Sequence, residues 1–156
     1  MTEYSLTAMS APTGGVNITV PIPQPVATFV AAASAKPVVL RWGTNISYTS
    51  SGGSPALGLG RPLVSGTTAN NITVGLPIDD SNAPTPLSIL VTDWGVPPAP
   101  PTQFMRRYVS PFTNGAGVLW EFPRGLGFPA GGQLALFLVN TGNSALVYDT
   151  EIVFDE

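Results

Sequence analysis

Residues 133–140 (QLALFLVN) and 145–154 (ALVYDTEIVF) carry the strongest strand patterns of the chain. The first segment carries apolar residues on both faces of an extended chain, which predicts a central strand buried on both sides. In the second segment Ile152 and Phe154 share one face, and the opposite face is more polar. Residues 141–144 (TGNS) supply a glycine-containing turn, so we predict that the two strands form a hairpin.

Six further segments combine β-branched or aromatic residues with turn residues at their ends. They are residues 16–20, 37–48 (bulged at Gly43), 70–76, 87–94, 103–110 and 117–122. Glycine and proline number 17 each, and they recur too often for long helices. The sequence therefore predicts an all-β fold, an antiparallel β-sandwich whose total of about eight strands fits a jelly roll. An immunoglobulin-like sandwich is the nearest alternative, but its cysteine-tryptophan-cysteine pattern is absent.

The 156 residues fit a single domain. Residues 16–156 are predicted to form the sandwich, and residues 1–15, which are polar and weakly patterned, are predicted to form an N-terminal arm. The chain starts without the basic and apolar segments of a secretory signal, and no apolar run approaches the roughly 18 residues of a membrane span. We therefore expect synthesis in a bacterial cytoplasm and no membrane partner.

Charge is scarce in this chain. Charged residues make up 10% of the sequence, and the net charge is −3. Lys36 is the single lysine, and Arg106-Arg107 is the one adjacent pair of arginines. Nucleic-acid binding needs clustered cations that neutralise phosphates, so the composition excludes a nucleic-acid partner. The arginine pair fits a solvated turn or an interface contact.

Cysteine and histidine are both absent. Their absence removes the commonest general base and metal ligand, together with Ser-His-Asp and Cys-His triads, so we expect no catalytic residue, metal or cofactor. Residues 79–82 (DDSN) offer oxygen ligands for calcium, although this is also ordinary turn chemistry. A carboxylate pair, as in glycosidases, is the catalytic alternative, with the candidates Asp93, Glu121, Asp149 and Glu151.

Two kinds of residue offer contact surface. Residues 96–102 (VPPAPPT) are predicted to run as a stiff extended segment, which either connects strands at the surface or lies along a partner. Nine aromatic side chains are able to stack on sugars, but most are expected in the core or between subunits. They are Trp42, Tyr48, Trp94, Phe104, Tyr108, Phe112, Trp120, Phe122 and Phe128.

Residues 118–130 (VLWEFPRGLGFPA) and 134–140 (LALFLVN), followed by Gly142, resemble the end of small jelly-roll structural proteins of tailed bacteriophages. These are the capsid decoration, or cement, proteins and the head fibres. The resemblance covers about the last forty of the 156 residues, and tumour-necrosis-factor-like trimers end in similar strands. The prolines and glycines from Pro123 to Pro129 predict a rigid turn without strand pairing.

The resemblance implies a structural virion protein on the capsid surface. Such a protein binds the major capsid protein as a homotrimer and stabilises the assembled shell. A head fibre that binds glycans or a receptor is the alternative, and a carboxylate-based glycan hydrolase is a further one. The expected contact residues are Pro97, Pro98, Pro100, Pro101, Arg106, Arg107, Trp120, Phe122 and Phe128.

Overall fold

The computed structural model describes residues 1–9, 23–33, 37–49, 56–78, 81–109, 116–140 and 146–156. These residues form two antiparallel sheets that pack against each other, which confirms the predicted all-β sandwich. Sheet A has the order β6 (Leu76–Pro77), β1 (Glu3–Met9), β11 (Leu146–Asp155), β3 (Val38–Thr49) and β9 (Ala116–Phe128). Sheet B has the order β5 (Thr67–Val74), β7 (Ile89–Val96), β2 (Gln24–Val30), β10 (Gln133–Asn140), β4 (Ala56–Gly60) and β8 (Arg106–Val109).

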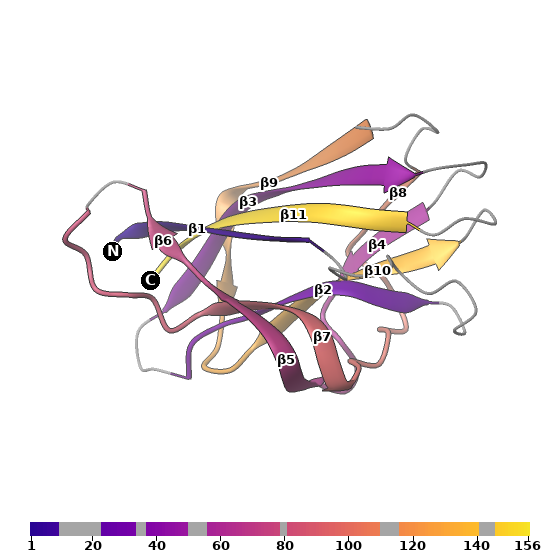
Figure 1. Cartoon of the computed structure of the whole chain (residues 1–156), viewed down its shortest axis with the longest axis horizontal. Helices are drawn as coiled ribbons and strands as arrows, with labels where there is room; N and C mark the ends of the chain where they lie inside the picture. Colours follow the sequence, from indigo (N-terminus) through magenta and orange to yellow (C-terminus); the bar gives the residue numbers. More distant parts are fainter. Residues whose placement is uncertain (10–22, 34–36, 50–55, 79–80, 110–115, 141–145) are drawn as a thin grey trace.

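Eight of these strands form one long antiparallel ribbon that is folded over on itself. β1 pairs with β11, β2 with β10, β3 with β9 and β4 with β8. Within each half of the ribbon, successive strands alternate between the two sheets (Figure 1). This connectivity is that of a jelly roll, as predicted, but the described residues hold eleven strands and not about eight. We term these eight strands the ribbon, and residues 61–105, which carry β5, β6 and β7 between β4 and β8, the excursion.

The predicted hairpin between the last two strands is wrong. β10 lies in sheet B between β2 and β4, whereas β11 lies in sheet A between β1 and β3. The reason is the rolled ribbon, which sends consecutive strands to opposite sheets. The turn residues 141–144 and the predicted strand over residues 16–20 lie outside the described residues. Each of the other predicted segments overlaps a strand: residues 37–48, 70–76, 87–94, 103–110 and 117–122.

The predicted N-terminal arm is also wrong over the residues that the structure describes. Residues 3–9 form β1, which is hydrogen-bonded to both β6 and β11. Tyr4 and Leu6 alternate along this strand and are buried in the core, where the Tyr4 ring stacks on Phe154 with the ring centroids 5.6 Å apart. This buried apolar face fixes the segment in the sheet. Residues 10–15 of the predicted arm lie outside the described residues.

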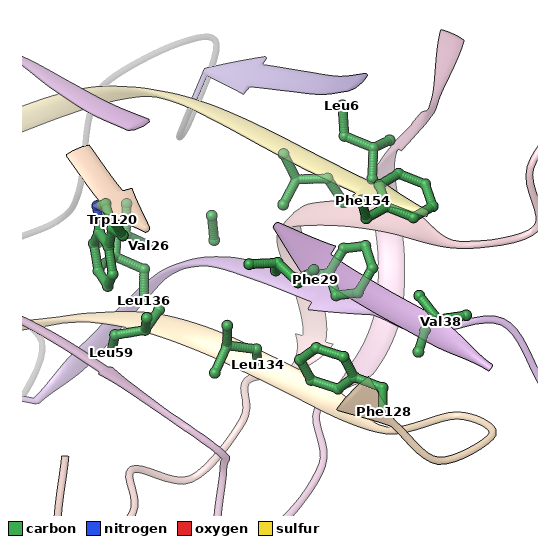
Figure 2. Close-up of a cluster of buried hydrophobic side chains, with 14 of the residues drawn as sticks. Leu6, Val26, Phe29, Val38, Leu59, Trp120, Phe128, Leu134, Leu136 and Phe154 are labelled. Atoms are coloured by element: carbon green, nitrogen blue, oxygen red, sulfur yellow. The ribbon is translucent and has the colours of Figure 1, made fainter. Parts of the chain in front are cut away.

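The core lies between the sheets and is rich in aromatic rings. Phe29 of β2 contacts Phe154 and Phe128, with ring centroids 5.2 and 5.4 Å away (Figure 2). Leu134 of β10 belongs to the same cluster. Residues 134–138 of β10 are all buried, so the prediction of a central strand buried on both faces is confirmed.

Arg41 of β3 is skipped in the pairing with both neighbouring strands, β9 and β11, so two bulges lie at the same place in sheet A. Trp42 pairs with Glu121 and Leu40 with Leu126, so Arg41 alone faces the four β9 residues 122–125. The irregularity in β3 thus lies at Arg41 and not at the predicted Gly43. β9 continues beyond the bulge to Phe128, so the predicted turn without strand pairing is wrong for residues 126–128. Gly125 allows the bulge because it adopts a φ of 70°.

Candidate functional site

The proline-rich segment packs on the outer face of its own sheet B. A Cβ on Gly60 of β4 would lie 2.7 Å from Pro101, and one on Gly58 would lie 2.6 Å from the Phe104 ring. Phe104 also packs edge-on against Phe137 of β10, with ring centroids 5.8 Å apart. The two glycines therefore make room for a third layer, which explains why β10 is buried on both faces.

The predicted contact prolines differ in their exposure. Pro98 is buried, Pro100 and Pro101 are half-buried, and Pro97 is exposed. Between them, Ala99 exchanges backbone hydrogen bonds with residues 63 and 64 of the excursion. The segment is thus a surface connection held along its own sheet, and contact with a partner stays a prediction for its exposed part.

Several predicted contact residues meet at the seam between β8 and β9, where the edges of the two sheets approach each other. The Arg106 guanidinium lies over the Phe122 ring, 5.0 Å from its centroid, and donates a hydrogen bond of 2.9 Å to the carbonyl of Glu121. Tyr108 packs against Trp120 with ring centroids 5.0 Å apart. These contacts close one side of the sandwich within a single chain.

The seam continues toward the end of β9. Arg61 lies over the Phe128 ring, 5.4 Å from its centroid, and donates a hydrogen bond to the carbonyl of Gly127. Trp120 and Phe128 are buried, so they serve the interior of the chain and not a surface contact. Arg107 is exposed on β8 and remains free to meet a partner.

A small cavity lies between the sheets beside Trp120. Its volume is about 30 Å³, and its polar lining includes Asn45 and Thr150, which are joined by a buried hydrogen bond of 2.6 Å. The indole Nε1 of Trp120 is buried and has no hydrogen-bond partner among the described residues. The cavity has room for about two water molecules, and we assign it to solvent and not to a ligand.

The outer face of sheet A gathers much of the negative charge of the protein. Five of the nine acidic residues lie on it: Glu3, Glu121, Asp149, Glu151 and Asp155. Among the described residues, one ion pair is formed, between Arg41 and Asp155. Asp93, another candidate of the carboxylate pair, lies on β7 in sheet B, so it cannot act together with Glu121 at the far edge of sheet A.

A shallow pocket opens on this face beside the two bulges. Its volume is about 330 Å³, and it is lined by Arg41, Trp42, Glu121, Phe122 and Pro123. Trp42 is half-buried and pairs directly with Glu121 across the strands. The sequence offered Trp42 as one of nine aromatic residues able to stack on a ligand and Glu121 as one of four carboxylate candidates. It could not bring them together, because their pairing joins strands far apart in the chain.

A second surface feature is a row of aliphatic side chains on β5, on β6 and on the residue that follows β6. Every second residue is exposed, and the residues between them point inward or are partly covered. We term this set the apolar row: Ile72, Val74, Leu76 and Ile78. Gly75 lies on the inward side, where a Cβ would come within 2.9 Å of Pro86 and 3.3 Å of the Ser5 carbonyl. The usual pattern of a surface strand, apolar inside and polar outside, is therefore reversed here.

The remaining candidates concern metals and membranes. Asp79 and Asp80 of the predicted calcium loop lie outside the described residues, and the described ones hold no group of three acidic side chains placed to bind a metal ion. In the described ranges, no helix is long and apolar enough to cross a bilayer. Comparison with protein families, with curated proteins and with solved structures finds no match to this chain.

Proposed function

We propose that this protein is a structural component of a bacteriophage virion that binds the outer surface of the capsid, as a homotrimer, and stabilises the assembled shell. It acts by binding, because a protein that binds the assembled shell and not its separated subunits shifts the equilibrium toward the shell. The jelly-roll fold and the resemblance of residues 118–142 to decoration proteins support this proposal. The apolar row is the observation that carries it.

Exposure of the apolar row to water is energetically unfavourable. Its four members expose between 46 and 73% of their surface, and none is charged. Complete burial of such a side chain contributes about 1.5–3 kcal/mol. A contiguous exposed apolar surface marks a site of protein contact more often than scattered single residues do. Burial of the row against a partner would therefore supply a large part of a binding free energy.

The charges around the row indicate the chemistry of the partner. Residues 62–105 contain no lysine or arginine, and their three charged residues are Asp79, Asp80 and Asp93. A complementary surface is therefore an apolar strip flanked by cations, since opposite charges steer association and exclude other partners. We assign that strip to the major capsid protein.

The test is co-sedimentation with expanded capsids of the phage that encodes the chain. Ile72→Thr and Leu76→Thr, made together, remove two aliphatic side chains and keep residues that favour strands. We expect the affinity for capsids to fall at least about tenfold, which corresponds to about 1.4 kcal/mol.

The matched control is Leu119→Thr, which changes an exposed aliphatic residue on β9, at the opposite edge of sheet A. This variant should sediment with capsids as the parent chain does. Equal binding by all three proteins would refute the assignment of the row, and absence of the parent chain from the capsid pellet would refute the function. Analytical ultracentrifugation of the parent chain tests the homotrimer.

A further inference from the structure

We infer that the pocket on the outer face of sheet A, lined by Arg41, Trp42, Glu121, Phe122 and Pro123, binds a neutral sugar ring. The inference does not rest on the proposed function, because the pocket lies between β3 and β9, whereas the apolar row lies on β5 of sheet B and on β6 at the opposite edge of sheet A. The row reaches the sheet at β6, and the pocket lies between β3 and β9. Four strand spacings separate β6 from β9, which is about 19 Å.

The hollow follows from the two bulges. Arg41 also has no partner in the pairing of β3 with β11, because Val153 pairs with Trp42 and Phe154 pairs with Leu40. Residues 122–125 of β9 leave the pairing at the same level. The sheet surface therefore opens at this point without any loop insertion. Bulges occur frequently beside binding sites because they redirect side chains.

The side chains of the pocket are held in place by contacts outside it. The Nε atom of Arg41 donates a hydrogen bond of 2.6 Å to Asp155, and this ion pair fixes the guanidinium on the sheet. Trp42 packs beside Val153, which is fully buried although it lies on the outer face. The Arg106 guanidinium packs on the Phe122 ring. A site with side chains fixed in advance loses little conformational entropy when a ligand binds.

The lining matches the two surfaces of a sugar ring. Trp42 offers an apolar aromatic surface for the C–H groups of the ring, and Glu121 offers a carboxylate that accepts hydrogen bonds from hydroxyl groups. Arg41 supplies donors for hydroxyl or ring oxygens. The pocket volume of about 330 Å³ is at the lower end of small-molecule sites, which fits one sugar unit.

The charges beside the pocket do not give it a strong net charge. Arg41 is paired with Asp155, and Glu121 makes no ion pair among the described residues. Arg106, which lies over Phe122, offsets the charge of Glu121. The pocket therefore offers no strong attraction to phosphate groups, uronic acids or sialic acids, and its aromatic surface favours a neutral hexose or N-acetylhexosamine.

The test uses the full chain on an array of neutral and anionic glycans, followed by titration with the neutral trisaccharides of glucose and of N-acetylglucosamine. Free sugars and surface-bound polysaccharide are compared as separate arms. We expect binding of a neutral glycan, with at least a tenfold loss for Trp42→Ala and a smaller loss for Glu121→Gln. Glu121→Gln keeps the size and shape of an exposed side chain, so it tests the site even if Trp42→Ala does not fold.

Two control variants are available on the same chain. Leu119→Ala changes an exposed residue on the same face, and Trp94→Ala removes a half-exposed tryptophan on sheet B. Both should bind the glycan as the parent chain does. The inference is overturned if no neutral glycan binds, if anionic glycans bind in preference, or if Glu121→Gln and Trp42→Ala both bind unchanged. Loss of capsid binding by the apolar-row variant, with glycan binding retained, would separate the two sites.

Discussion

The ribbon places its large apolar side chains between the two sheets, whereas the excursion places many of them on the surface. Among the described residues, twelve large apolar side chains are exposed, and nine of them belong to the excursion. β5 and β6 of the excursion keep the two-residue period of a strand but expose their aliphatic side chains, whereas β7 buries Leu90 and Val91 as the ribbon strands do. The ribbon therefore supplies most of the core, and β5 and β6 supply surface for contact.

The largest effect should come from the aromatic core of the ribbon. Phe29→Ala removes a fully buried ring between Phe128 and Phe154, and we expect the free energy of unfolding to fall by about 3–5 kcal/mol. Val74→Ala, in the excursion, should change it by less than about 0.5 kcal/mol. Urea denaturation, followed by tryptophan fluorescence, measures both. Similar losses in the two variants would show that Val74 contributes to the core as Phe29 does.

A smaller effect should come from the contact between the ribbon and the excursion. Gly58→Ala places a Cβ 2.6 Å from the Phe104 ring, which must move, and we expect a loss of about 1–3 kcal/mol. Gly127→Ala is the matched control, because a Cβ there meets no atom within 4 Å. Hydrogen exchange in residues 97–105 should rise in the first variant alone. Unchanged hydrogen exchange and unchanged stability in Gly58→Ala would show that residues 97–105 do not depend on packing against β4.

The smallest effect should be a response of the ribbon to alkaline pH. Burial raises the pKa of the Tyr148 hydroxyl above its ordinary value, and the excursion contains no tyrosine. The unfolded chain therefore loses this proton first. The protonated Tyr148 hydroxyl contributes its full share of the free energy of unfolding below about pH 10. Above that pH the free energy of unfolding falls, by up to about 1.4 kcal/mol per pH unit. Urea denaturation at pH 9, 10 and 11 should show this decline.

Tyr148→Phe should reduce the alkaline decline, whereas the double variant of the apolar row should keep it. An identical decline in Tyr148→Phe and the parent chain would contradict the assignment to this residue.

The sequence predicts the strands with strong local patterns and misses those without them. β10 carries large apolar residues at almost every position, so its burial on both faces could be foreseen. β4 (Ala56–Gly60) contains no β-branched or aromatic residue, and its two glycines are explained only by the layer that packs on it. Strand pairing depends on partners far apart in the chain, which is why a turn signal at residues 141–144 predicted a hairpin that the fold does not contain.

The candidate sites show the same limit. Alternation at Ile72, Val74 and Leu76 shows that these side chains share a face, but a period of two does not reveal which face is buried. The sugar pocket depends on a shift in register between β3 and β9, and neither segment encodes that shift alone. Trp42 and Glu121 are therefore visible in the sequence as candidates, whereas their association is visible only in the fold.

The two ends of the chain lie side by side (Figure 1). Thr2 and Glu156 exchange two backbone hydrogen bonds, and the carboxylate of Glu156 accepts two more from the backbone of residues 87 and 88. The amide of Ile78, at the end of the apolar row, donates to the carbonyl of Glu3. An affinity tag or fluorescent fusion at either end would therefore emerge beside β6 and shield the row.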